Sequence, residues 1–247
     1  RQRQMCIRDR CRIHIVACGS AYHTGFTSKY IFEGMARIPV EVDVASEFRY
    51  RNPILEDGAL VIIISQSGET ADSLAALRMA KERGVKTLGI VNVVGSSIAR
   101  EADNVMYTWA GPEIAVATTK AYSTQLIAQY LLAMKFAKVR GTVSQNDFDA
   151  MIQSLERLPE QISLLLSHKE NVQRFANRYL AAEHVFFIGR GIDYAISMEG
   201  SLKLKEISYI HSEAYAAGEL KHGTISLIED GRLVVCLLYT SDAADDR

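Results

Sequence analysis

The sequence has few cysteines, and their placement excludes two classes of protein. The four cysteines are Cys6, Cys11, Cys18 and Cys236. No two of them have CxxC spacing, and no cluster of histidines stands near them. A zinc site or a disulfide framework is therefore not expected. The expected compartment is a reducing cytoplasm.

Excess charge and long apolar runs are also lacking. Lys and Arg total 28 against 29 Asp and Glu, so the net charge is -1, and binding to nucleic acid through bulk basic charge is not expected. Apolar runs such as Ala59–Ile64 are far shorter than a bilayer span, and no secretory signal pattern follows the basic N-terminus. We expect neither a nucleic-acid nor a membrane partner.

The 247 residues, 48% of them hydrophobic, suffice for one large domain or two smaller ones.

The two ends of the chain differ from the rest. Residues 1–11 show no clear period, and residues 238–247 are polar and follow a predicted strand directly. Both are expected to be non-native tails, with genuine flexible tails as the alternative on composition alone. Between them we expect a first domain at 12–143, a helical connection at 144–180 and a second domain at 181–237.

Short apolar runs alternate with helical patterns through the first domain. The pattern predicts strands at 12–18, 40–44, 59–65, 87–91 and 104–108, helices at 22–36, 70–83 and 119–139, and a loop at 45–50. This alternation is typical of the doubly wound α/β class, a parallel sheet flanked by helices on both faces. Residues 147–180 are predicted to be helical, with Pro159 dividing them.

The second domain begins like the first. The matching stretches are His14–Gly19 with His184–Gly189, Ser46–Arg49 with Gly218–Lys221, and 59–62 with 232–235. The spacings between these landmarks are nearly constant, which predicts an internal duplication. The second copy ends near its second major strand, so we expect one complete copy and one truncated copy.

A hydroxyl-rich loop after the strand at 59–65 predicts a phosphate site. It contains Ser65, Gln66, Ser67 and Thr70 around Gly68, and a helix follows. Ligands of parallel sheets bind at the carboxyl ends of strands, where a helix N-terminus offers free N–H groups. The glycine-rich run and lysine of a P-loop are absent, which favours a phosphate monoester over a nucleoside triphosphate. The alternative is that Ser67 or Thr70 merely caps the helix.

Two further loops could close the pocket. Gly19 and Ser20 follow the first strand, and Val116–Thr119 precede a long helix. Taken alone, each of these loops is better explained by a structural role.

Three charged residues lie within the apolar face of a predicted helix at 194–210. At about 100° per residue, Glu199, Lys203 and Glu206 fall within an arc of about 60°. Because buried charges need partners, this set indicates either an acid–base site or a structural salt-bridge network. His222 follows between glycine-bearing turns, and a lone histidine is usually structural.

Several stretches together resemble a known family. The loop Ser65–Thr70 resembles the signature of sugar isomerase (SIS) domains. Four further stretches make the resemblance more specific within the SIS group: 45–51, 116–121, 199–211 and 213–223. With them, residues 13–235 resemble the isomerase half of the glutamine–fructose-6-phosphate aminotransferases.

The resemblance implies fructose 6-phosphate as substrate and glucosamine 6-phosphate as product, with no cofactor and no metal. It implies that the phosphate and sugar are bound by Gly19, Ser20, Ser65, Gln66, Ser67, Thr70, Val116 and Thr118. It implies that Glu206 moves a proton between C1 and C2, supported by Lys203 and Glu199. His222 would assist ring opening across the interface of a homodimer.

The sequence also departs from the family pattern. The glutaminase domain is expected upstream in a full-length parent, and the family's Schiff-base lysine is expected beyond the last residue. Ser20, Ala21 and Thr224 stand where the family usually has Thr, Ser and Pro. The activity of the chain by itself is therefore open. Two alternatives remain, a non-catalytic SIS-type module that binds a sugar phosphate, and another SIS enzyme such as a deglycase.

Overall fold

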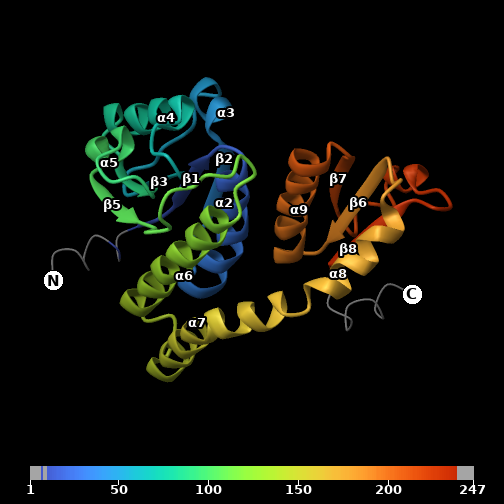
Figure 1. Cartoon of the computed structure of the whole chain (residues 1–247). Helices are drawn as coiled ribbons and strands as arrows, with labels where there is room; N and C mark the ends of the chain where they lie inside the picture. Colours follow the sequence, from blue (N-terminus) through green and yellow to red (C-terminus); the bar gives the residue numbers. More distant parts are fainter. Residues whose placement is uncertain (1–6, 8–9, 238–247) are drawn as a thin grey trace. The chain divides into compact units, whose positions relative to one another are not determined.

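The computed structural model describes residue 7 and residues 10–237 (Figure 1). The chain divides after Phe148 into two compact units, each of which is considered by itself. Among the described residues, none of the helices combines the length and the apolar character needed to span a membrane.

The first unit is built on a parallel sheet of five strands. These are β1 (Ile13–Ala17), β2 (Val40–Val44), β3 (Leu60–Ser65), β4 (Lys86–Val91) and β5 (Asn104–Tyr107), in the order β2-β1-β3-β4-β5. β3 lies at the centre and all six of its residues are buried. Ile62 and Ile64 pack on one face of the sheet, and Val61 and Ile63 on the other. A strand covered on both faces accounts for its unbroken apolar run.

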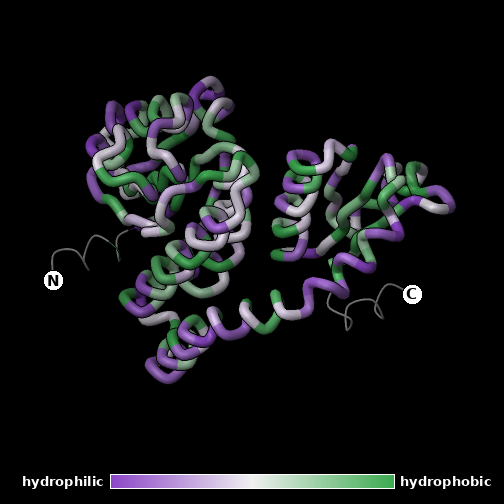
Figure 2. The backbone as a smooth tube through the Cα atoms, in the orientation of Figure 1, coloured by the Kyte–Doolittle hydropathy of each residue, from purple (hydrophilic) through white to green (hydrophobic). Residues whose placement is uncertain are grey.

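Helices cover both faces of this sheet. One face packs against α2 (Ser20–Ile31), the π-helical turn Phe32–Ala36 and α6 (Lys120–Arg140). The other packs against α3 (Ala45–Tyr50), α4 (Ala71–Glu82) and α5 (Ser97–Glu101). In Figure 2 the apolar residues of the unit gather on the strands between these helices. The predicted doubly wound α/β fold is confirmed.

The strand order creates a switch point between β1 and β3. The two strands are hydrogen-bonded neighbours, with Ala17 opposite Ile64, but the helices that follow them, α2 and α4, lie on opposite faces. The loops after Ala17 and Ser65 therefore leave the same edge of the sheet side by side. In open parallel sheets this is where ligands bind.

The second unit contains a smaller parallel sheet. Its elements are α7 (Gln145–Leu166, which begins before the division), α8 (Lys169–Ala176), β6 (His184–Gly189), α9 (Ile192–Ser208), β7 (His211–Ala216) and β8 (Leu233–Leu237), with single 3-10 turns at Asn177–Tyr179 and Thr224–Leu227. The strand order is β7-β6-β8, and α9 packs on β6 and β7. In Figure 2, α8 carries mostly hydrophilic residues.

The second sheet repeats the first three strands of the first sheet. The order β7-β6-β8 corresponds to β2-β1-β3, as an internal duplication requires. The predicted alignment of Gly19 with Gly189 is wrong by two residues. Gly191 precedes α9 with φ 55° and ψ -122°, nearly the angles of Gly19 before α2, which are 56° and -133°. With this correction the chain advances by 28 residues from Gly19 to Glu47 and from Gly191 to Glu219 alike.

Several local predictions were wrong. Residues 45–50 form helix α3 instead of a loop, because Phe48 is buried and holds a short turn against the sheet. Pro159 lies inside α7 and does not divide the helical region, since a proline removes one hydrogen bond while the turns on either side continue. The break falls at residues 167–168. Helix α5 and strand β7 were not predicted.

The expected domain limits of 12–143, 144–180 and 181–237 stay predictions. Most of the two expected tails, residues 1–6, 8–9 and 238–247, lies outside the described residues. Within the first tail, Arg10 donates a hydrogen bond from Nη1 to the carbonyl oxygen of Ala59 at 2.7 Å.

Candidate functional site

The hydroxyls of the loop Ser65–Thr70 bind within the loop and leave its helix uncapped. Ser65 Oγ lies 2.9 Å from Thr70 Oγ1 and accepts a hydrogen bond from the N–H of Gly68 at 3.0 Å. Ser67 Oγ accepts from the N–H of Glu69, which precedes the helix. Thr70 occupies the N-cap of α4, yet no described side chain caps that helix. The capping alternative is therefore wrong, and the first N–H groups of α4 remain available to an anion.

Gly68 fixes the shape of the loop. Its φ is +68°, a conformation that glycine adopts without strain. A Cβ atom at this position would overlap Ser96 Oγ and lie 2.6 Å from Ser96 Cβ. Backbone bonds also join the loop to the segment after β4, because Gln66 O accepts from the N–H of Asn92 at 3.1 Å. The loop is thus fixed by contacts with the segment between β4 and α5.

Gly19 and Ser20 lie at the same sheet edge as this loop. They follow β1, and Ser20 is the first residue of α2. In the sheet β1 lies beside β3, and Cys18 Sγ lies 3.9 Å from Ser73 Oγ on α4. The structure therefore brings two of the predicted binding segments together at the β1/β3 switch point.

Val116 and Thr118 lie on the loop between β5 and α6. Thr118 Oγ1 donates to Glu113 Oε2 at 2.8 Å, and this hydrogen bond is the main cause that lowers the pKa of Glu113. Val116 is fully exposed. Among the described residues, no hydrogen bond joins this loop to Ser65–Thr70, so the structure leaves the role of Val116 and Thr118 as a prediction.

The charged residues of α9 form a connected row. The Glu199 side chain is buried, with 7% exposed, and Lys203 Nζ lies 3.5 Å from its Oε1. The same ammonium group also binds Glu206, whose side chain is 33% exposed. The row therefore runs from a buried carboxylate through an ammonium group to a carboxylate that solvent can reach.

His222 lies in an exposed turn after β7. Its N–H donates to Glu219 O at 2.9 Å, and in the described part of the chain no hydrogen bond or ion pair joins its imidazole to the row on α9. Nearby, Tyr215 donates a hydrogen bond to Glu213, which raises the pKa of Tyr215 to about 12. That phenol stays protonated at neutral pH.

A group with possible metal ligands lies on β1 and β2, away from the loop. His14, Glu41 and Asp43 offer atoms within 4.8 Å of one another. Arg12 binds Glu41 at 2.8 Å, and Arg51 binds Asp43 at 2.8 Å. Since two guanidinium groups already balance the two carboxylates, this group is an ion-pair network around a buried histidine.

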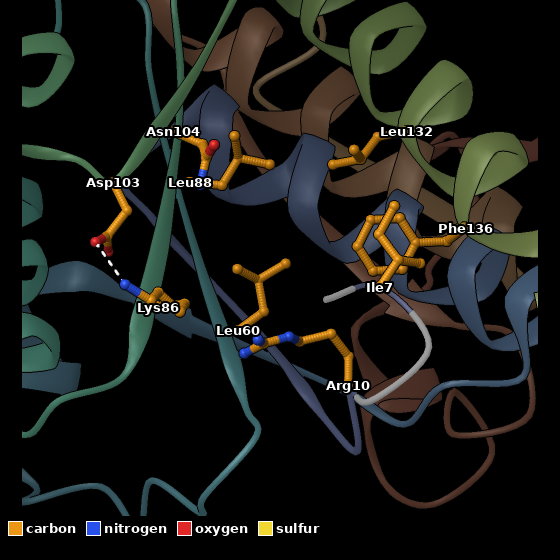
Figure 3. A pocket seen from close by; sticks show the side chains of 9 residues that line it. All are labelled: Ile7, Arg10, Leu60, Lys86, Leu88, Asp103, Asn104, Leu132 and Phe136. Atoms are coloured by element: carbon orange, nitrogen blue, oxygen red, sulfur yellow. Dashed lines mark hydrogen bonds and ion pairs between the residues drawn. The ribbon is translucent and has the colours of Figure 1, made fainter. Parts of the chain in front are cut away.

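A cavity of about 400 Å³ lies at the opposite edge of the sheet (Figure 3). It is lined by Leu60 and Lys86, the first residues of β3 and β4, and by Phe136 of α6. Lys86 pairs with Asp103 at 3.2 Å across its rim. The cavity therefore lies at the amino ends of the strands and is separate from the loop Ser65–Thr70.

Fold and loop together define a parallel α/β protein with a hydroxyl-lined loop at the switch point of its sheet. The model of the SIS domain family matches residues 6–135 and 179–246. The chain belongs to this family.

Two curated relatives within this family have the same name. The chain is 61% identical to the glutamine–fructose-6-phosphate aminotransferase (isomerizing) of Caldanaerobacter subterraneus subsp. tengcongensis, over 94% of this chain and 38% of that protein. It is 58% identical to the enzyme of the same name from Clostridium acetobutylicum, over 95% of this chain and 38% of that protein. The chain thus spans little more than a third of the relatives it matches.

Two solved structures are similar to the chain in fold and in sequence. The C-terminal domain of glucosamine-fructose-6-phosphate aminotransferase from Francisella tularensis has a TM-score of 0.92 and 40% identity, and the match covers 95% of this chain and 66% of that one. A glucosamine-6-phosphate deaminase from Thermotoga maritima has a TM-score of 0.76 and 29% identity, over 92% of this chain and 67% of that one.

Proposed function

We propose that the chain is the sugar-isomerising part of a glutamine–fructose-6-phosphate aminotransferase. In this function it binds fructose 6-phosphate and moves a proton between C1 and C2 of the sugar. The observation that carries the proposal is the loop Ser65–Thr70, a hydroxyl-lined turn at the β1/β3 switch point whose helix has no side-chain cap. The 61% identity to an enzyme of that name supports the choice of substrate.

The first unit would hold the phosphate. A phosphate monoester needs hydrogen-bond donors and a positive potential, and the N–H groups and dipole of α4 supply both. The hydroxyls of Ser65, Ser67 and Thr70 and the amide of Gln66 add donors around the same turn. Gly19 and Ser20 contribute the N-terminus of α2, and Val116 and Thr118 would contact the sugar.

The row on α9 would carry the chemistry. Glu206 takes a proton from C1 of the open-chain ketose and returns it to C2, while O1 loses its hydroxyl proton and O2 gains one by exchange with solvent, so the carboxylate ends the cycle unchanged. Lys203 stabilises the negative charge that develops on the enediol oxygen. Glu199 holds Lys203 in place through its buried carboxylate. His222 would assist ring opening, in a homodimer as the family resemblance implies.

Ammonia for the amino sugar would come from glutamine through a separate glutaminase domain of a longer protein. The length of the curated relatives is consistent with this arrangement, because the chain covers only 38% of them.

Exchange of the sugar's protons with solvent tests the proposal. The chain is incubated with fructose 6-phosphate in D₂O, and the C1 proton signals are followed by NMR. We expect these signals to fade with the chain and to persist with its Glu206→Gln variant. Binding without exchange would favour the alternative of a sugar-phosphate binding module, and the absence of both would contradict the proposal.

A further inference from the structure

Two adjacent residues of the loop Ser65–Thr70 cap the N-terminus of α5. Glu69 Oε1 accepts a hydrogen bond from the N–H of Ser97 at 2.7 Å. The carbonyl oxygen of Gly68 accepts from the N–H of Ile98 at 3.0 Å. Ser97 and Ile98 are the first two residues of α5, so the loop satisfies N–H groups that would otherwise have no partner within the helix.

The Glu69 carboxylate carries a negative charge, and its position decides how strongly that charge acts on a phosphate at the loop. A free carboxylate on this loop would repel a phosphate. Here it is bound to the positive end of α5, and the hydrogen bonds from Ser97 lower the pKa of Glu69. Of the other charged groups that act on it, Arg100 is attractive and Glu101 repulsive. The negative charge is thus compensated at α5.

We propose that Glu69 is a positioning residue of the phosphate loop. By holding the N–H of Ser97, it fixes the turn around Gly68 and thereby aims Ser65, Ser67 and Thr70 at one point, without touching the ligand. The inference deepens the proposed function and rests on it.

Calorimetric titration of the whole chain with fructose 6-phosphate tests this role. Glu69→Ala removes the acceptor, and we expect the Kd to rise about fivefold. Glu69→Gln keeps an acceptor oxygen and should restore the Kd to within about twofold of the parent. Ser97→Pro breaks the same bond from the other side, because proline lacks the N–H but suits the first position of a helix. Ser96 before it has an extended backbone that tolerates a following proline.

Two further measurements separate positioning from general stability. Glu101→Ala is the matched control, because Glu101 joins α5 to Arg78 of α4 at 2.7 Å but does not touch the loop. Its Kd should stay within about twofold of the parent, even where its melting temperature falls as far as that of Glu69→Ala. The double variant Glu69→Ala/Ser97→Pro should bind no more weakly than either single variant, because both remove one interaction.

Three results would overturn the role of Glu69. These are a parent-like Kd for Glu69→Ala and Ser97→Pro, an equal loss of affinity in Glu101→Ala, or fully multiplicative losses in the double variant. A parent chain that binds neither fructose 6-phosphate nor inorganic phosphate would instead refute the proposed function, and this role with it.

Discussion

The ammonium nitrogen of Lys203 lies 3.5 Å from Oε1 of Glu199, one helical turn earlier on α9, and also binds Glu206 about one turn later. Glu199 is the most deeply buried of the three side chains and Glu206 the most exposed. A buried carboxylate therefore fixes the position of the ammonium group, and the ammonium group fixes the position of the accessible carboxylate. This order fits the proposed function, in which Glu199 supports Lys203 and Glu206 transfers the proton.

Removing the ammonium group should cost stability as well as function. In Lys203→Met the buried Glu199 carboxylate loses its counter-charge, and breaking a buried pair from one side costs about 3 kcal/mol. The free energy of unfolding, measured with urea, should fall by about that amount. The double variant Lys203→Met/Glu199→Gln should recover part of the loss, because no buried charge is then left unpaired. A single variant as stable as the parent would contradict the pairing.

Glu206→Gln should separate catalysis from binding. The amide cannot accept the C1 proton, so the exchange rate of fructose 6-phosphate in D₂O should drop by about 10²–10⁴-fold. The Kd for the sugar phosphate should change little, because the proposed phosphate site at Ser65–Thr70 lies in the other unit. Glu229→Gln is the matched control, since Glu229 also pairs with a cation three residues away, Arg232, at 3.5 Å. Equal exchange rates in the two variants would remove Glu206 from the mechanism.

Gly68→Ala should abolish sugar-phosphate binding through two effects. The new Cβ would meet Ser96, and alanine is strained at a φ of +68°. Gly95→Ala carries the second effect only, because its φ is +74° and nothing lies within 4 Å of the added Cβ. Gly95→Ala should therefore lose about 1 kcal/mol of stability and retain binding. Comparable Kd values for the two variants in calorimetry would show that the contact with Ser96 does not shape the loop.

The buried His14 should make the chain less stable in mild acid. Burial lowers its pKa below 6.5, and this effect outweighs the opposite influence of Glu41 and Asp43 and adds to that of Arg12 and Arg51. The unfolded chain thus binds a proton that the folded chain does not, and stability falls as the pH drops through about 6.5.

The measurement is the melting temperature between pH 7.5 and 5. His14→Gln should show a smaller fall than the parent, whereas the exposed His168→Gln should fall as the parent does. A parent-like slope for His14→Gln would show that His14 is not the titrating group.

Much of the first unit could be predicted because its inner strands β1 and β3 are buried along their whole length. The apolar run of β3 and the hydroxyls after it need no tertiary information to be recognised. Helices α3 and α5 were missed because six and five residues are too few to show a period. Only the burial of Phe48 and of Ile98 in the folded unit marks them as packed elements.

The parts of the site that the sequence did not reveal depend on contacts between distant residues. The hydrogen bond from Ser97 to Glu69 joins positions 28 residues apart, and no local sequence pattern predicts it. Similarly, strand β7 has mixed composition and is defined by its pairing with β6, with His211 opposite His184. The two-residue shift between Gly189 and Gly191 became visible only through the backbone angles before α9.

The most direct test of the central claim is a thermal shift of the purified chain with fructose 6-phosphate and with fructose at the same concentration. A ligand that binds the folded state raises its melting temperature, by an amount that grows with concentration above the Kd. We predict a rise with fructose 6-phosphate, none with fructose, and none with either ligand in Gly68→Ala. Equal shifts with both sugars, or no shift with the phosphate, would contradict a phosphate site at Ser65–Thr70.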